Sequence, residues 1–363
     1  MRWLPKERGL EDDTPMVDIR SPKRNSNSQF RQIMQALGPA FAPAIILLSP
    51  KAYLWRILAH RSPLSPTLFK RRRSLPKASL NGRYLSHEPY LRPTIYCNCH
   101  APEIIYLADQ FRLESDNDWD YAIKIYNFVR NEIVYAIEPF PRRGAVGTIE
   151  SGYGFCVDKT NALIALARAG GIPARYCQFS TTNVFEGDTV PWVEAYANRF
   201  QMWQKSSDWR LRIIGRGMSR RLDDLKSARF QNSPGLGKHI FAELKINDSW
   251  ILADPTFSDQ EAIVNGMPLP RLGYDPITLF GFKGTVVDRS EAFPVGRNFW
   301  LGRWILCLLC RGLLDIVNQA FEEKRREGQR LLDDIGEADY MRRMRRFYIP
   351  QPSAIKLALS PIP

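Results

Sequence analysis

The stretch "GYGFCVDKTNALIALARAGGIP", residues 152–173, constrains the fold most, because it sets a cysteine between a glycine-rich turn and a strong helical pattern. Gly152 and Gly154 permit backbone conformations that residues with a Cβ resist. The apolar spacing predicts a helix over Val157–Ala169, which Gly-Gly-Ile-Pro at 170–173 ends. Cys156 stands at the helix start, where unpaired N–H groups and the helix dipole favour a thiolate. We interpret Cys156 as a candidate nucleophile, with a small buried hydrophobic residue as the alternative.

A nucleophilic cysteine needs a base within hydrogen-bond reach. The chain has four histidines, so few assignments are open. His60 and His87 lie in a basic N-terminal region, and His100 adjoins Cys99. His239 is therefore the candidate base.

His239 heads a pattern that predicts a hairpin, with strands over Lys238–Ile246 and Trp250–Asp254 joined at Asn247-Asp248. With a two-residue loop, Ile246 pairs with Ser249 and Phe241 pairs with Asp254. His239 then lies diagonal to Asp254 on the same face, roughly 7 Å away between Cα atoms. A three-residue loop would put the two on opposite faces. Asparagine tolerates the positive φ of a tight turn and aspartate does so less well, so the turn favours the first register without deciding it.

Two motifs, "GFCVDKTNALIALARAGGIPARY" and "HIFAELKINDSWILADPT", resemble the transglutaminase-like superfamily of papain-like cysteine enzymes. "YLRPT" at 90–94 and "FVRNEIVYA" at 128–136 resemble its bacterial members. The resemblance implies an α+β fold, with a papain-like core built on an antiparallel sheet. It also implies a catalytic triad of Cys156, His239 and Asp254, in which the imidazole takes the thiol proton and the carboxylate holds the ring.

The sequence departs from this family pattern at several places. Phe241 stands where the family has tryptophan, and Asp248 where the turn has glycine. "VPWVEAY" at 190–196 also resembles the histidine strand, with Val190 in place of histidine, but no Asp-Pro strand follows it closely. Glu243, four residues after His239, could be a supporting polar group, but we expect an exposed strand residue.

Composition and pattern divide the chain into three segments. Residues 1–89 form a basic, partly disordered extension, residues 90–290 the catalytic domain, and residues 291–363 a helical segment with a tail. Within the domain, helices are predicted over Ala101–Phe111 and Trp119–Val134, and a strand over Ala174–Thr181. Residues 183–237 show no clear period and are interpreted as an insertion or lid. A charged helix is predicted around Gln319–Leu332.

Charge is concentrated at the N-terminus. The formal net charge is +13, and residues 1–90 carry 16 Lys and Arg against 6 Asp and Glu. Such a region suits an acidic partner or a membrane surface, or it is a solvated extension, and no pattern indicates a specific nucleic acid. The apolar stretches Gln32–Pro50 and Phe299–Val317 are broken by prolines or charges and are not predicted to span a membrane. Six cysteines in this length favour a reducing, cytoplasmic location.

No metal or cofactor is expected. "CNCH" at 97–100 and "CLLC" at 307–310 could supply ligands, but cysteines among leucines on a helix are usually core residues. We therefore predict a thiol enzyme that acts on peptide or amide bonds through a thioester: a protease, an amidase or a protein-glutamine acyltransferase. Its partner would be a peptide or protein substrate. The alternative is a catalytically silent transglutaminase-like module that binds a peptide or protein.

Overall fold

A computed structural model describes most of the central and C-terminal chain. The described residues are 73–80, 86–136, 144–183, 191–207, 209, 212, 215–217, 219, 238–275, 283–293, 318–319 and 321–354. Most of the basic N-terminal region and both apolar stretches weighed above lie outside them. Within the described parts, no helix combines the length and the apolar character that crossing a membrane requires.

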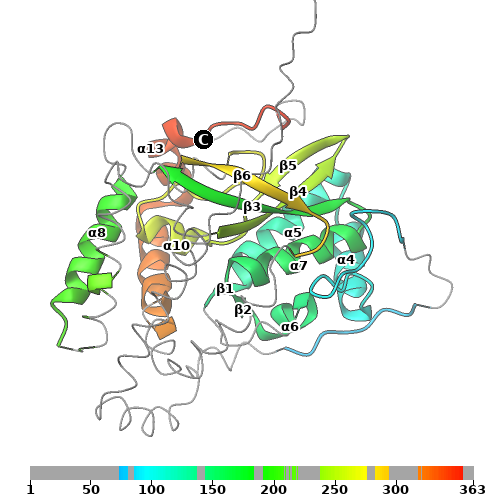
Figure 1. The fold of residues 1–363 in the computed structure, drawn as a ribbon, viewed down its shortest axis with the longest axis horizontal. Helices are drawn as coiled ribbons and strands as arrows, with labels where there is room; N and C mark the ends of the chain where they lie inside the picture. Colours follow the sequence, from blue (N-terminus) through cyan, green and yellow to red (C-terminus); the bar gives the residue numbers. More distant parts are fainter. Residues whose placement is uncertain are drawn as a thin grey trace, which may run out of the picture.

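A four-stranded antiparallel sheet in the order β5-β4-β3-β6 forms the centre of the fold (Figure 1). Its strands are β3 (Ala174–Asn183), β4 (Lys238–Ile246), β5 (Ser249–Ala253) and β6 (Lys283–Ser290). A separate parallel pair joins β1 (Val134–Tyr135) to β2 (Tyr153–Gly154), directly before the candidate nucleophile.

Four helices in the first part of the described chain pack around one another. They are α4 (Pro102–Leu113), α5 (Asp118–Glu132), α6 (Gly144–Ser151) and α7 (Cys156–Ala169). α7 contacts β4 as well as α4, α5 and α6, and every residue from Val157 to Arg168 is buried. A helix buried on all sides normally carries mostly apolar residues.

The buried polar side chains of α7 bond neighbouring elements instead of water. Lys159 Nζ donates to the Arg130 carbonyl oxygen (2.9 Å), and Thr160 Oγ1 donates to that of Ile240 (3.2 Å). The guanidinium of Arg168 donates to the backbone carbonyl oxygens of Arg92, Ala174 and Glu291. α7 is therefore fixed from several directions, and Cys156 is fixed with it.

The helices and strands that the sequence predicted agree closely with the structure, and the α+β class with an antiparallel sheet is confirmed. The sequence did not predict α6, the short helix that follows β5 or the edge strand β6. α5 ends at Glu132, earlier than expected, because Val134 and Tyr135 pair with β2. The segment 183–237 contains an unexpected helix, α8 (Pro191–Gln204). Most of "VPWVEAY" belongs to α8, so that motif is helical and is not a second histidine strand.

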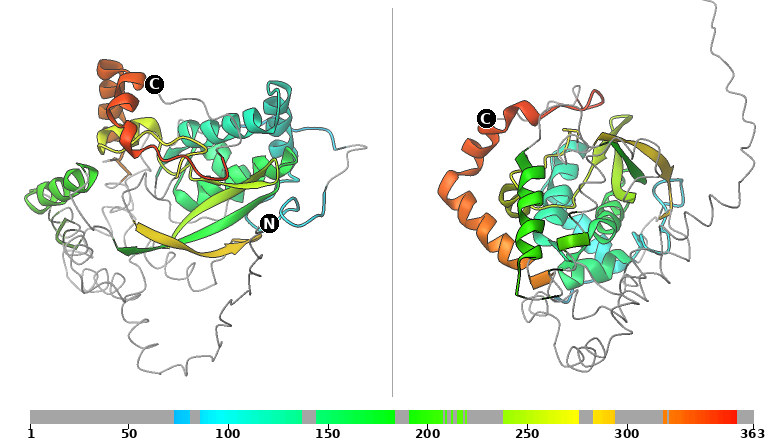
Figure 2. Two further views of the ribbon diagram at one scale, coloured as in Figure 1. Left: turned by 90° about the horizontal axis from the view of Figure 1, so that it is seen from above. Right: turned by 60° about the vertical axis from the view of Figure 1, so that its left-hand side comes forward.

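The described part of the C-terminal region is largely helical, as predicted. A helix covers residues 321–335 and is followed by α13 (Glu337–Arg343) and the 3₁₀ turn η2 (Arg345–Phe347). These helices share a second hydrophobic cluster with α8 and with α10 (Asp259–Val264), which follows β5. Figure 2 shows α8 and the C-terminal helices gathered at one end of the molecule, away from α4.

Candidate active site

Glycines shape the approach to Cys156. Gly152 has a φ of 69°, in the left-handed region that other residues rarely adopt. A Cβ on Gly154 would lie 2.6 Å from the Cβ of Asp158 and 3.2 Å from Cγ2 of Thr148. Both positions therefore favour glycine, the first for its backbone angle and the second for lack of space.

Cys156 is the first residue of α7 and is partly exposed, whereas Cys97, Cys99 and Cys177 are buried. The Asp158 carboxylate accepts the N–H of the residue before the helix (3.2 Å). The N–H of Cys156 has no acceptor within the helix, because first-turn amides point out of the helix end. It can therefore serve an oxyanion formed next to the sulfur.

The hairpin adopts the register that the two-residue loop predicts. Ile246 pairs with Ser249, and β4 remains paired with β5 up to Ala253, the residue before Asp254. Asn247 and Asp248 have φ values of 46° and 62°. Two consecutive left-handed residues form the turn that matches the twist of paired strands. Aspartate thus occupies the position where the family has glycine without lengthening the loop.

This register brings His239 and Asp254 together. Their Nε2 and Oδ2 atoms lie 2.5 Å apart, with 25% of the His239 side chain exposed and 1% of the Asp254 side chain. The second oxygen of Asp254 accepts the Thr256 N–H (3.0 Å). Tyr126, from α5, donates its hydroxyl to the Asp254 carbonyl oxygen (2.9 Å). Strand β4, the turn after β5 and helix α5 thus all contact this one aspartate.

The side chain of Cys156 also acts on the imidazole of His239, because it is one of the causes that raise the pKa of the ring. Because Nε2 is engaged by Asp254, Nδ1 is the nitrogen that remains for the sulfur. Burial lowers the pKa of His239, but the charge of Asp254 and hydrogen bonds with Asp254 and Cys156 outweigh burial and raise the pKa to about 10. Asp254 and Cys156 thus favour the protonated form of the ring over the neutral form.

Glu243 was expected to be exposed, and this prediction is wrong. The residue is 3% exposed, and its carboxylate lies between Arg175 (2.6 Å) and Arg289 (3.1 Å). Arg175 also lies over the ring of Trp250, 3.9 Å from its centroid. Alternation along β4 places Glu243 on the same side of the strand as His239, but arginines of β3 and β6 cover it there. Glu243 therefore ties three strands together.

The cysteines of "CNCH" belong to the main hydrophobic core. Cys97 and Cys99 are fully buried, and Cys99 Sγ donates to the Leu91 carbonyl oxygen (3.4 Å). Among the residues that the structure describes, no group of three or more histidine, cysteine or acidic side chains could hold a metal ion. "CLLC" at 307–310 lies outside those residues.

Sequence reasoning missed the support around Asp254. Tyr126 and Arg130 occur one helical turn apart on α5, and the periodicity indicated only an ordinary amphipathic helix. Arg130 is 3% exposed, and its two terminal nitrogens donate hydrogen bonds to the carboxylate of Asp259 (2.9 and 3.1 Å). Asp259 lies in the chain that follows Asp254. An arginine within the apolar pattern of a predicted helix was the signal that could have indicated this contact.

Comparison with family models agrees with the motifs. Residues 105–209, which include Cys156 but end before His239, match the transglutaminase-like superfamily model. No curated protein matches. A candidate cysteine protease from Cytophaga hutchinsonii is 18% identical, with a TM-score of 0.32, and the match covers 56% of this chain and 46% of that one. The chain thus spans less than half of that protein. Over residues 105–209 the chain is thus similar to the transglutaminase-like superfamily.

Proposed function

We propose that the protein is a cysteine-dependent hydrolase or acyltransferase that acts on peptide or amide bonds through Cys156, His239 and Asp254. One observation carries the proposal: the imidazole of His239 lies 2.5 Å from the Asp254 carboxylate, and the side chain of Cys156 acts on the same ring. A sulfur, a base and an orienting carboxylate in this order are what nucleophilic thiol catalysis requires.

The thiol proton of Cys156 passes to Nδ1 of His239, which holds it as an imidazolium beside the sulfur. The thiolate attacks the carbonyl carbon of the substrate, and the resulting oxyanion accepts the N–H of Cys156. His239 then gives the proton to the leaving amine as the carbon–nitrogen bond breaks, which leaves a thioester. Water or a second amine attacks the thioester with His239 as base and releases the sulfur.

Asp254 keeps the imidazole in one orientation and stabilises its positive charge. Its second oxygen is bonded by the Thr256 N–H, so the carboxylate cannot rotate without losing a buried hydrogen bond. General acid–base catalysis of this kind contributes about 10²- to 10⁴-fold in rate. We therefore expect the loss of Asp254 or His239 to remove most of the activity.

Alkylation with iodoacetamide tests the proposal without a known substrate. At pH 7 the reagent should label Cys156 first, as located by mass spectrometry, and His239→Ala should slow that labelling by about tenfold or more. His100→Ala is the matched control, because its ring lies against that of His87 in another part of the fold. Equal labelling of all cysteines, or no effect of His239→Ala, would support the silent peptide- or protein-binding module instead.

A second assay separates hydrolysis from transfer. The protein would be incubated with casein and a fluorescent primary amine at mildly alkaline pH. Amine incorporation that depends on Cys156 would identify an acyltransferase, and new N-termini without incorporation would identify a protease. Release of ammonia without either product would identify an amidase.

A further inference from the structure

The outer edge of β5 is occupied by a side chain from the C-terminal region. β5 is an edge strand of the sheet, so every second residue points its N–H and C=O away from β4. At Leu252 both groups bond the carboxamide of Gln351: the N–H donates to Oε1 (2.8 Å), and Nε2 donates to the carbonyl oxygen (2.9 Å). Gln351 is 4% exposed and also donates to the Tyr274 carbonyl oxygen (2.9 Å). One side chain thus fixes the strand two residues before Asp254.

The same region holds the chain that leaves Asp254. Tyr340 and Tyr348 donate their hydroxyls to the carbonyl oxygens of Met267 (2.9 Å) and Leu269 (3.1 Å). Glu337, at the start of α13, is ion-paired with Arg271. Residues 267–271 are consequently attached to the C-terminal region at several positions.

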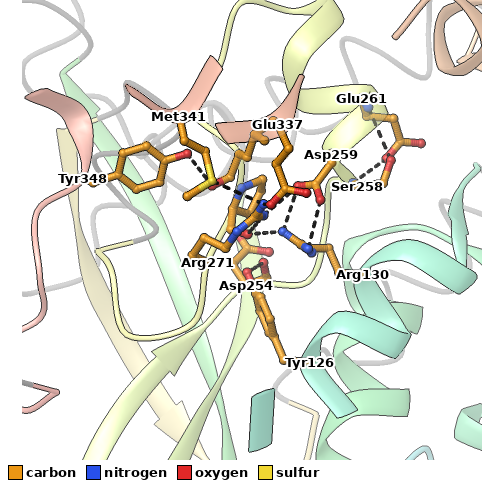
Figure 3. Close-up of polar contacts among 12 residues, drawn as sticks. Tyr126, Arg130, Asp254, Ser258, Asp259, Glu261, Arg271, Glu337, Met341 and Tyr348 are labelled. Atoms are coloured by element: carbon orange, nitrogen blue, oxygen red, sulfur yellow. Dashed lines mark hydrogen bonds and ion pairs between the residues drawn. The ribbon is translucent and has the colours of Figure 1, made fainter. Parts of the chain in front are cut away.

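Arg271 connects these attachments to the site. Its guanidinium donates to Asp259 (2.8 Å), which also accepts from Arg130 of α5. Figure 3 shows Arg271 beside Asp259 and Glu337, with Tyr126 extending to Asp254. The chain after Asp254 is therefore held between α5 and the C-terminal helices.

Close backbone packing indicates that this attachment is specific. A Cβ on Gly328 would clash with the backbone oxygen of Gln260 in α10. Glycine at this position allows the helix over 321–335 to approach α10 closely. Gln329, the next residue, accepts a hydrogen bond from the Gln260 side chain (3.0 Å).

We propose that the segment 321–354 is a positioning element of the active site, and that Gln351 is its positioning residue for Asp254. The inference rests on the proposed function, because it assigns this segment a part in orienting the triad. Without the carboxamide, the N–H and C=O of Leu252 lose their partners, and the strand end that aims Asp254 at His239 is released. Gln351 touches no reacting atom, so its effect must pass through Asp254.

A double-mutant cycle on the full chain tests this assignment. Gln351→Leu should slow alkylation of Cys156 at pH 7 about three- to tenfold, in the same direction as Asp254→Asn. The double variant should be no slower than Asp254→Asn alone. Tyr121→Phe, which removes a buried hydroxyl that donates to the Leu166 carbonyl oxygen (2.7 Å), is the control for general destabilisation. Gln351→Glu replaces the donor with a carboxylate oxygen that faces the carbonyl oxygens of Leu252 and Tyr274, so it should slow alkylation at least as much as Gln351→Leu.

Independent effects of Gln351→Leu and Asp254→Asn, or an effect no larger than that of Tyr121→Phe, would overturn the inference. A second measurement, the titration of His239, separates failure of the positioning role of Gln351 from failure of the proposed function. Gln351→Leu should lower the pKa of His239 by about one unit in an NMR titration, because the carboxylate is held less well. If His239→Ala leaves alkylation unchanged, the proposed function fails, and this titration alone decides whether Gln351 positions Asp254. An unchanged His239 titration refutes that role.

Discussion

Replacing Asp254 with asparagine should change how the stability of the protein depends on pH, because the buried Lys159 and the partly exposed His239 act in opposite directions. Burial lowers the pKa of Lys159 to about 7. The pKa of His239 is raised to about 10, since Asp254 and Cys156 outweigh its burial. In the unfolded chain these groups titrate near their ordinary values of about 10.4 and 6.5.

The sign of each contribution follows from which state holds the proton. Stabilisation by protonated His239 is complete below about pH 6.5 and is lost as the pH rises through about 10. The cost of burying Lys159 is complete below about pH 7 and is relieved as the pH rises toward about 10.4. In the wild type the two effects largely cancel between about pH 7 and about pH 10.

Asp254→Asn removes the charge that holds the His239 proton and leaves the Lys159 effect unopposed. Because the charge of Asp254 also raises the pKa of Lys159, the Lys159 effect should begin at a lower pH in the variant. A difference of one bound proton changes the free energy of unfolding by about 1.4 kcal/mol per pH unit. As the pH rises from about 7 to about 9, the free energy of unfolding of the variant should therefore increase by about 2–3 kcal/mol more than that of wild type. Lys159→Met should have the opposite effect, because its free energy of unfolding should fall as the pH rises over the same range. Urea unfolding followed by tryptophan fluorescence at constant ionic strength measures both, and ionisation of the tyrosines and the buried cysteines cancels in the comparison. Parallel stability curves for wild type and Asp254→Asn would refute the reasoning.

Three further substitutions have expected outcomes. Gly154→Ala places a methyl group 2.6 Å from the Cβ of Asp158, so thermal unfolding should show a loss of about 1–3 kcal/mol and alkylation of Cys156 should slow. Glu243→Gln removes a buried charge from between two arginines and should cost about 1–3 kcal/mol in urea unfolding, with the pH dependence of Cys156 alkylation unchanged. Gly328→Ala should lower the melting temperature by several degrees and increase proteolysis of the C-terminal segment, whereas a melting temperature equal to wild type would contradict the packing on α10.

The parts of the site that the sequence predicted are those with local signals. The pair Asn247-Asp248 favoured the two-residue loop, and the register of that loop places His239 beside Asp254. The glycines before Cys156 likewise reflect backbone geometry within a few residues of the cysteine. Such features follow from turn chemistry and strand alternation, which depend on neighbours in the sequence.

The parts that could not be predicted depend on contacts between distant segments. Gln351 bonds the backbone of Leu252, and a glutamine that bonds a strand edge has no periodicity or spacing to reveal it. Glu243 was misjudged for the same reason, because its burial depends on Arg289 from a strand that comes later in the chain. α8 was missed because residues 183–237 show no clear apolar period, and the described apolar residues of α8 belong to the cluster that includes residues of α10 and the C-terminal helices.

The hydrogen bonding of α7 also bears on how this protein could change during evolution. Several polar residues that the helix buries already serve another element, so an exchange at Lys159, Thr160 or Arg168 would disturb a second part of the fold as well. New substrate preferences would therefore arise most readily through the surrounding loops, while the helix that carries the sulfur accumulates few changes. A saturation library of the whole chain should show α7 as its longest run of intolerant positions.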